Sequence, residues 1–284
     1  MNLTAPSEVK ALLDRLDFRP SKVLGQNFLI DANILRIMLA AAHLTKDDAV
    51  LEVGPGLGVL TEWLVRWAGR VVAVEKDRRL CAHLRTHFAG TKNLEIVEGD
   101  ALEVGLEGLL AGGVNKLVSN LPYSVASRLI VELVESPHRP EQMVVTVQRE
   151  VANRLAAGPG TKDYGLISVM TQLRYEVGAV KNVSPSCFLP APDVWSAIVN
   201  LVLRDPPPAG PRDPAHLKAI LKTAFAQRRK QMASILRRGK TLADLERTLK
   251  AAGVDPRARP ETLSPAQWVS LSDVLAAESG RTSP

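Results

Sequence analysis

The stretch Ala49-Val50-Leu51-Glu52-Val53-Gly54-Pro55-Gly56-Leu57-Gly58 decides the fold class of this chain. Its first five residues are mostly apolar and predict a buried strand. The glycines that follow permit a tight turn and a close approach of the backbone to a ligand, and a helix is expected from about Leu60. A strand, a glycine-rich turn and a helix in this order are typical of a nucleotide-binding α/β sheet. Their spacing, G-x-G-x-G, departs from the dinucleotide fingerprint, so a pyrophosphate is not expected, and taken alone the triplet favours a purely structural turn.

Acidic residues end the next two predicted strands. The strand Arg70–Val74 ends at Glu75, and the strand Leu94–Glu98 is followed by Asp100. A carboxylate at the first position accepts from ribose hydroxyls in this fold, and an ionised carboxylate at the second can accept from an adenine amine. A single acid at a strand end is usually a cap or a surface charge. Three strand ends carrying Gly, Glu and Asp favour an adenosine-type ligand.

The fourth predicted strand, Lys116–Ser119, runs into Asn120-Leu121-Pro122-Tyr123. Taken alone, this tetrapeptide is more often a turn, because Asn and Pro are common turn residues. Its position at a strand end, where open α/β sheets bind ligands, makes it a candidate floor for a flipped base. The proline would bend the backbone, and the tyrosine would offer a ring for stacking.

The rest of the chain alternates strands and helices up to a proline-rich segment. This alternation predicts a mostly parallel, doubly wound sheet, and the prolines of residues 205–213 interrupt it. We therefore expect a catalytic domain of residues 1–204, a linker of residues 205–213 and a helical domain of residues 214–284. We expect helices at Ser7–Leu16, Asp31–Ala42, Ser127–Val134, Glu150–Ala157, Pro214–Arg229, Gln231–Arg238, Thr241–Ala252 and Pro265–Ala277. We expect further strands at Met143–Val147, Tyr175–Val180 and Trp195–Leu203.

Composition and charge narrow the function classes. The 284 residues are 46% hydrophobic. No apolar run is long enough to span a membrane, and the N-terminus does not resemble a signal peptide, so we expect a cytoplasmic globular protein. Cys81 and Cys187 lie far apart without metal-ligand spacing, which predicts core thiols, no disulfide and no metal site. Residues 1–200 contain 21 Lys and Arg against 22 Asp and Glu, whereas residues 201–284 contain 15 against 8. This asymmetry indicates either a polyanionic partner or a solvated basic face.

Six motifs of the chain are specific in combination and weak singly. They are Gly25-Gln26-Asn27-Phe28-Leu29, Glu52-Val53-Gly54-Pro55-Gly56-Leu57-Gly58, Asn120-Leu121-Pro122-Tyr123, Gln148-Arg149-Glu150-Val151, Phe188-Leu189-Pro190-Ala191-Pro192-Asp193-Val194-Trp195-Ser196 and Phe225-Ala226-Gln227-Arg228-Arg229-Lys230. Together they resemble one family, the KsgA-type small-subunit ribosomal RNA adenine dimethyltransferases. The resemblance covers nearly the whole chain and implies a Rossmann-like methyltransferase sheet with a small all-helical C-terminal domain. It also implies S-adenosylmethionine as methyl donor, S-adenosylhomocysteine as product and a monomeric enzyme. The implied substrate is two adjacent adenines in the 3′-terminal hairpin loop of 16S rRNA, free or in a pre-ribosomal small subunit.

The resemblance also implies roles for individual residues. The implied cofactor-binding residues are Gln26, Asn27, Leu29, Gly54, Gly56, Gly58, Glu75, Lys76, Asp100, Ala101 and Asn120. The implied catalytic residues are Asn120, Leu121, Pro122, Tyr123 and Phe188, with Phe188 stacking on the target base opposite Tyr123. The RNA-binding residues are expected to be Lys22, Arg149, Arg228, Arg229 and Lys230, although residues 228–230 are also consistent with a solvated helix end.

The chemistry explains these residue types. An adenine exocyclic amine is a poor nucleophile, because its lone pair is delocalised into the ring. The Asn120 side-chain oxygen and the Leu121 carbonyl would hold its N–H groups so that the lone pair turns toward the methyl group. Orientation of this kind supplies roughly 7–11 kcal/mol of barrier lowering, and no strong base is needed. Stacking on an aromatic ring returns about 1–3 kcal/mol of the cost of extruding the base.

Three other readings remain open at this point. The macrolide-resistance enzymes methylate an adenine of large-subunit rRNA, but Gly54-Pro55-Gly56 and Leu121 resemble the small-subunit branch more. A DNA adenine methyltransferase fits the motif order and the F-x-P-x-P segment less well. A ribosome assembly factor that acts mainly by binding RNA is the third, and the intact Asn120 and Tyr123 argue against lost catalysis.

Overall fold

The computed structural model describes residues 2–21, 25–206, 208, 210–237 and 241–279. The chain forms two compact units. The first, here called the sheet unit, comprises Met1–Ala152 and Val177–Leu203, and the second, the helical unit, comprises Asn153–Glu176 and Arg204–Pro284. In the part of the chain that is described, no helix is both long and apolar enough to span a membrane.

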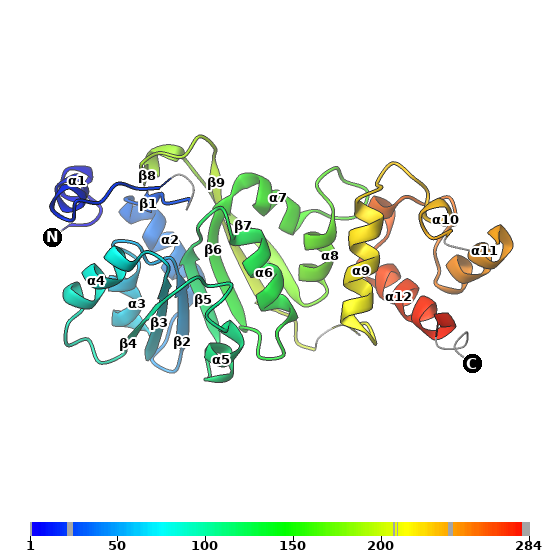
Figure 1. Cartoon of the computed structure of the whole chain (residues 1–284), viewed down its shortest axis with the longest axis horizontal. Coiled ribbons are helices and arrows are strands. Elements are labelled where there is room, and N and C mark those ends of the chain that lie inside the picture. The colour runs from blue at the N-terminus through cyan, green and yellow to red at the C-terminus, as the bar shows by residue number, and fades with distance from the viewer. Residues whose placement is uncertain (1, 22–24, 207, 209, 238–240, 280–284) are drawn as a thin grey trace. The chain divides into compact units, whose positions relative to one another are not determined.

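A seven-stranded sheet forms the centre of the sheet unit (Figure 1). Its strands are β2 (Ala49–Val53), β3 (Arg70–Glu75), β4 (Leu94–Glu98), β5 (Lys116–Asn120), β6 (Gln142–Gln148), β7 (Tyr175–Val183) and β9 (Ser196–Leu203). They lie in the order β4-β3-β2-β5-β6-β9-β7. The first five are parallel to their neighbours, and β9 is antiparallel to β6. The predicted mostly parallel, doubly wound sheet is thus confirmed.

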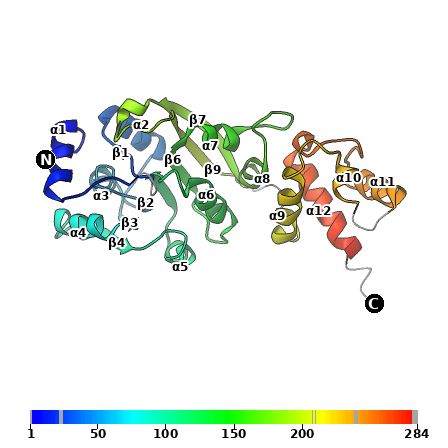
Figure 2. The same cartoon turned by 45° about the horizontal axis from the view of Figure 1, so that its top comes forward.

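Helices cover both faces of this sheet. The helices of the sheet unit are α1 (Pro6–Arg15), α2 (Ala32–Ala42), α3 (Thr61–Trp67), α4 (Arg78–His87), α5 (Leu106–Ala111) and α6 (Ala126–Glu135), with α7 (Arg149–Ala156) crossing into the helical unit and a 3-10 turn at Pro185–Cys187. Val50, Val71 and Val118 share one sheet face and belong to the same core as α2 and α3. Figures 1 and 2 show α6 on the other side of the sheet. Burial on both faces explains why the strands read as apolar runs.

Helix α2 shows how local sequence signals set an element. Its predicted N-cap, Asp31, accepts hydrogen bonds from the backbone N–H groups of Asn33 and Ile34, which satisfies two otherwise unpaired donors. Ile34 and Met38 point into the core at helical spacing. The prediction of a helix that begins after Asp31 is confirmed.

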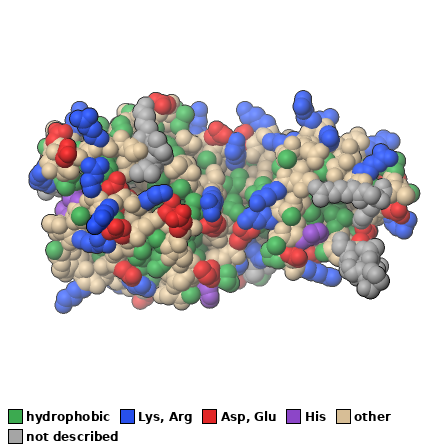
Figure 3. Space-filling model, in the orientation of Figure 1, with side chains coloured by type: hydrophobic (Ala, Val, Ile, Leu, Met, Phe, Trp, Pro, Cys, Tyr) green, Lys and Arg blue, Asp and Glu red, His purple; other side chains and the backbone are tan. Residues whose placement is uncertain are grey.

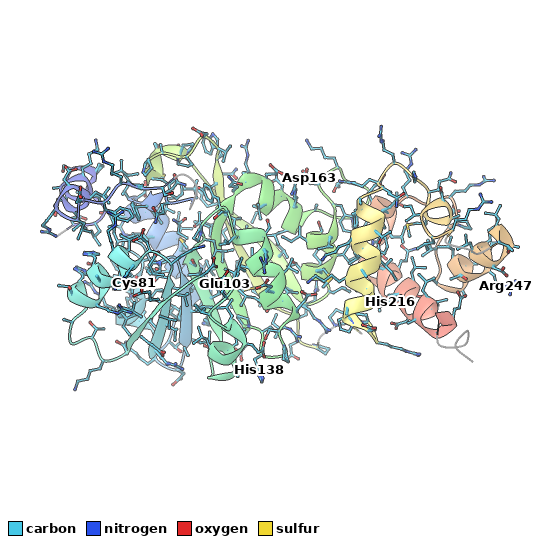
Figure 4. The ribbon with its side chains drawn as sticks, in the orientation of Figure 1. Cys81, Glu103, His138, Asp163, His216 and Arg247 are labelled. Carbon is cyan, nitrogen blue, oxygen red and sulfur yellow. The ribbon has the colours of Figure 1, made fainter. Side chains whose placement is uncertain are left out.

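The helical unit has a separate core. Its helices are α8 (Leu166–Gln172), α9 (Pro214–Phe225), α10 (Met232–Ile235), α11 (Leu242–Ala251) and α12 (Pro265–Ser279), with a 3-10 turn at Pro260–Thr262. Tyr164 and Met170 pack in this core with Leu217 and Trp268. His216 of α9, labelled in Figure 4, hydrogen-bonds Ser272 of α12 (3.2 Å).

The domain boundary differs from the expected one in one segment. The sequence placed residues 153–176 in the catalytic domain of residues 1–204, whereas they pack with the C-terminal helices. The reason is the burial of Tyr164, whose hydroxyl donates to the Leu263 carbonyl (2.9 Å). Helix α9 also ends at Phe225 rather than at Arg229, because turns follow it. Lys22 and the end of the predicted helix Gln231–Arg238 lie outside the described residues.

A two-stranded sheet was not predicted. It pairs β1 (Phe28–Leu29) with β8 (Phe188–Leu189) in antiparallel fashion, with Leu29 opposite Phe188. The sequence carries no signal for it, because a strand of two residues has no periodic pattern. This pairing fixes the G-Q-N-F-L segment beside the main sheet.

Candidate active site

A cavity opens where β2, β3 and β5 end, at the carboxyl edge of the parallel strands. It encloses about 1090 Å³, including solvent at its mouth. Its wall contains the following residues that the sequence analysis singled out: Gln26, Asn27, Leu29, Gly54, Gly56, Glu75, Lys76, Asp100, Ala101, Asn120, Leu121, Pro122 and Tyr123. Gly58 does not line it; a side chain there would meet Phe88 of α4 (2.8 Å), so this glycine permits helix packing.

The glycine-rich turn forms one wall because no larger residue fits there. Gly54 has φ +72°, and a Cβ on it would lie 2.9 Å from the Pro122 ring. Gly56 has φ +60°, and a Cβ would lie 2.9 Å from the Phe28 ring. Glycine alone adopts this left-handed conformation without strain. The turn therefore packs directly against the N-L-P-Y segment, and the two motifs form one site.

Glu75, at the end of β3, is held in place by backbone donors. Its Oε2 accepts from the N–H of Gly56 (3.1 Å) and its Oε1 from the N–H of Asp77 (2.8 Å). Burial raises its pKa. Beneath it, the thiol of Cys81 on α4, labelled in Figure 4, donates to the Glu75 carbonyl (3.3 Å). A carboxylate held this way has lone pairs left for ribose hydroxyls.

Asp100, which follows β4, forms an ion pair with Lys76. The distance between Lys76 Nζ and Asp100 Oδ2 is 2.7 Å, and Oδ1 accepts from the N–H of Leu102 (2.9 Å). The hydrogen bond from Lys76 is the main cause that lowers the pKa of Asp100. The carboxylate is therefore ionised and remains an acceptor for an amine.

Glu52 is a cavity residue to which the sequence analysis gave no role. It is only 2% exposed, and the Thr61 hydroxyl donates to its Oε2 (2.6 Å). Burial raises its pKa to about 8, with the nearby Glu75 charge adding to the effect. Glu52 is therefore mostly protonated at pH 7. The signal in the sequence was a single carboxylate inside an otherwise apolar strand.

Asn120, at the end of β5, has one satisfied and one unsatisfied side-chain atom. Its Nδ2 donates to the backbone carbonyl of Asn27 (3.1 Å). That carbonyl only accepts hydrogen bonds, so the amide nitrogen must face it and Oδ1 must face the other way. Oδ1 is buried and has no hydrogen-bond partner among the residues that the structure describes. A buried acceptor without a partner is rare in folded proteins, because leaving it unsatisfied costs free energy.

Tyr123 completes this end of the cavity. Its hydroxyl forms a hydrogen bond of 2.5 Å with the hydroxyl of Ser196, which is fully buried at the start of β9. Burial raises the pKa of the phenol, so Tyr123 stays protonated at neutral pH. Ser196 was quoted in the sequence motif without a role; the structure gives it one, because it fixes the far edge of the ring.

Two sets of expected site residues lie elsewhere. Phe188 is not among the residues that line the cavity; it pairs with Leu29 in the two-stranded sheet, and its side chain is 2% exposed in the core of the sheet unit. In the helical unit, Arg228 donates to the Lys162 carbonyl (2.8 Å), whereas Arg229 and Lys230 are exposed. Arg149 is exposed in the sheet unit. On the face drawn in Figure 3, acidic side chains lie between the basic ones, so no patch of one sign covers that face.

The sequence matches the family model for ribosomal RNA adenine dimethylase over residues 18–277. The chain belongs to the ribosomal RNA adenine dimethylase family. It is similar to ribosomal RNA small subunit methyltransferase A of Geobacillus kaustophilus, with 39% identity over 97% of each chain. It is 42% identical to the protein of that name from Magnetococcus marinus, over 93% of this chain and 95% of the relative.

Solved structures show the same fold. A dimethyladenosine transferase from Plasmodium falciparum has a TM-score of 0.74 and 24% identity, and the match covers 86% of this chain and 95% of that one. The 23S rRNA methyltransferase ErmE has a TM-score of 0.63 and 28% identity, over 88% of this chain and all of that one. The dimethylase family is S-adenosylmethionine-dependent, and this member is an rRNA adenine dimethyltransferase. The Gly54 turn, the buried Glu75 and the ionised Asp100 suit an adenosine with a polar tail.

Proposed function

We propose that this enzyme dimethylates the N6 amines of two adjacent adenines in the 3′-terminal hairpin loop of small-subunit rRNA. It acts as a monomer in the cytoplasm, during ribosome biogenesis. The relatives named for the small subunit share 39–42% identity with this chain over nearly its full length, whereas the 23S enzyme shares 28%. The identity therefore favours the small-subunit branch.

The observation that carries the acceptor half of the proposal is the unpartnered Oδ1 of Asn120. Bound S-adenosylmethionine supplies an electrophilic methyl group. Asn120 Oδ1 accepts one N–H of the target amine, and the Leu121 carbonyl, next along the same turn, accepts the other. With both N–H groups held, the nitrogen lone pair points along the open direction toward the Gly54 side of the cavity. The contribution of these residues is orientation.

The proton balance needs no dedicated base. As N6 forms its new bond to the methyl carbon, the bond from that carbon to sulfur would break and leave S-adenosylhomocysteine. The nitrogen is then cationic and acidic, and it loses one proton to water. Tyr123 stays protonated, so it serves as a stacking ring. For the second methyl transfer only one N–H remains, and Asn120 Oδ1 alone holds it.

The test is a substrate comparison with radiolabelled S-adenosylmethionine. The full-length enzyme is incubated with immature small ribosomal subunits, naked 16S rRNA and naked 23S rRNA, and N6,N6-dimethyladenosine is mapped by nuclease digestion and mass spectrometry. We expect two adjacent dimethyladenosines in the 3′-terminal loop of the small-subunit RNA. Label that enters only 23S rRNA would instead assign the enzyme to the large-subunit branch, and label in neither would refute the substrate assignment.

A further inference from the structure

Trp195 is a large aromatic side chain that the fold leaves in solvent. It is 46% exposed and directly precedes Ser196, whose hydroxyl holds Tyr123. Its backbone carbonyl accepts from the N–H of Arg149 (2.9 Å), just beyond the end of β6. Since β6 is parallel to β5, this is the edge of the sheet at which β5 delivers Asn120. The ring therefore lies at the same edge as the acceptor half of the cavity.

The surroundings of the ring suit a stacked partner. The Arg149 guanidinium lies 6.0 Å from the centre of the Trp195 ring. A cation over one face strengthens stacking of a base on an aromatic ring. Val194, 45% exposed, extends the apolar surface beside it. The exposed ring thus offers a flat apolar face backed by a positive charge.

The local charge argues against a simple phosphate clamp. Two exposed carboxylates, Glu150 and Asp193, lie within two residues of Arg149 and Trp195 in the sequence. Their negative charges reduce the attraction of this segment for a phosphate. Stacking is insensitive to this balance, because every base has an apolar face. The chemistry therefore points to an unpaired nucleobase as the occupant.

We propose that Trp195, with Arg149, stacks the unpaired base that neighbours the target adenine. This inference rests on the proposed function, because it requires a target adenine in a single-stranded loop. Trp195 touches a neighbouring nucleotide and not the reacting atoms, so it is a positioning residue. One peptide bond joins Trp195 to Ser196, and the Ser196 hydroxyl hydrogen-bonds Tyr123. A base on Trp195 therefore fixes how the target base presents its amine to Asn120.

The test pairs protein variants with RNA variants. Trp195→Ala and Trp195→Phe are assayed on immature small subunits whose RNA is intact or carries an abasic nucleotide on either side of the target. On intact RNA we expect Trp195→Ala to raise KM by roughly 5- to 160-fold, the range given by one stacked base. We expect kcat to be nearly unchanged and Trp195→Phe to be close to wild type. On the RNA that is abasic at the stacked position, wild type and Trp195→Ala should have equal KM values. Such loss of additivity identifies a direct contact.

Controls separate this inference from a structural effect. Trp67→Ala removes another exposed tryptophan, 55% exposed at the end of α3, and should leave KM unchanged. The melting temperature and the cofactor affinity of Trp195→Ala should match those of wild type. A wild-type KM for Trp195→Ala, or a loss that persists equally on all three RNAs, would overturn the inference. Failure of the proposed function is seen separately, since wild type would then methylate none of these particles.

Discussion

The two sides of the cavity differ in how many of their polar atoms already have partners. The donor side is the part of the cavity proposed for the methyl donor, at Gly54, Glu75 and Asp100. There, both oxygens of Glu75 accept backbone hydrogen bonds, and Asp100 is paired with Lys76. On the acceptor side, which is the end of the cavity at Asn120 and Tyr123, the buried Asn120 Oδ1 has no hydrogen-bond partner within the described part of the chain. We therefore predict that the donor side is preformed for its ligand, whereas the acceptor side is completed only by a ligand that donates hydrogen bonds.

This difference predicts which quantity, cofactor affinity or kcat, depends on each side of the cavity. Groups that are already satisfied set the affinity for the methyl donor, because their geometry does not depend on the second substrate. A group that finds its hydrogen-bond partner only in the target amine stabilises the complex only when that amine is in place. Interactions of this kind affect kcat. Substitutions on the two sides should therefore separate cofactor affinity from kcat.

The largest effect is expected from Asn120→Ala. The substitution removes the acceptor that orients the amine, so kcat should fall by about 10²- to 10³-fold, as for the loss of one preorganised hydrogen-bonding group elsewhere. The cofactor dissociation constant, measured by calorimetry, should change by less than about threefold, because that factor corresponds to less free energy than one typical hydrogen bond contributes. A matched control is Asn93→Ala, because Asn93 instead bonds the Val65 and Ala68 carbonyls at the end of α3. Cofactor affinity that falls in step with turnover would erase the distinction between the two sides.

Glu75→Ala is expected to show the opposite pattern. It removes the ribose acceptor and leaves the N–H groups of Gly56 and Asp77 without their present partner. Hydrogen bonds to a charged group contribute about 1.5–3 kcal/mol each, so the cofactor dissociation constant should rise by roughly 10- to 100-fold. At saturating cofactor, kcat should stay near the wild-type value.

The control for Glu75→Ala is a glutamate at the end of the next strand. Glu98 ends β4 and forms an exposed ion pair with Arg85, so Glu98→Ala should bind cofactor normally. A wild-type calorimetric affinity for Glu75→Ala would contradict the assignment of the donor side.

Features of the cavity that follow from local sequence patterns were predictable from the sequence. The sequence predicted that the glycine turn and Glu75 follow neighbouring strands, because each is a local pattern, and their role in holding the cofactor stays a prediction. Asp100 followed from the same rule, and the cavity contains all three. The end of β5 at Asn120 was also predicted from a local apolar run.

Features that depend on distant partners were not predictable. Asn120 is oriented by the hydrogen bond that its Nδ2 donates to the backbone carbonyl of Asn27, 93 residues earlier. Phe188 carried an expectation of stacking, yet its pairing with Leu29 buries it. Residues 153–176 were assigned to the wrong unit because Tyr164 finds its core among helices that begin 50 residues later. In each case the deciding contact joins segments whose proximity no local pattern encodes.

Glu52→Gln tests the electrostatics of the donor side. The pKa of Glu52 is raised to about 8 by burial, so the folded protein binds this proton more tightly than the unfolded chain does. Folding stability therefore falls as the pH rises from about 4.5 to about 8, and it changes no further above that. Glutamine cannot ionise, so the variant should lose less stability over this range, with a melting temperature at least about 3 °C above wild type at pH 8.5, a shift of roughly 1 kcal/mol.

The comparison for Glu52→Gln is Glu95→Gln, because Glu95 is an exposed strand residue paired with Arg70. Both variants and the wild type are melted without cofactor between pH 5 and pH 8.5. Parallel curves for wild type and Glu52→Gln would show that Glu52 is already ionised in the folded state.

The smallest effect is expected from Tyr123→Phe, and it probes how firmly the acceptor side is built. The variant keeps the stacking ring and removes only the hydroxyl that bonds Ser196. One hydrogen bond is worth about 0.5–1.5 kcal/mol, so kcat/KM should fall by less than about tenfold, whereas Tyr123→Ala, which also removes the ring, should cost more. If the bond serves to fix the ring, Ser196→Ala should reproduce the loss, and the double variant should be no worse than either single one. Additive losses would mean that the two hydroxyls act separately, and the acceptor side would then depend on Asn120 and the ring alone.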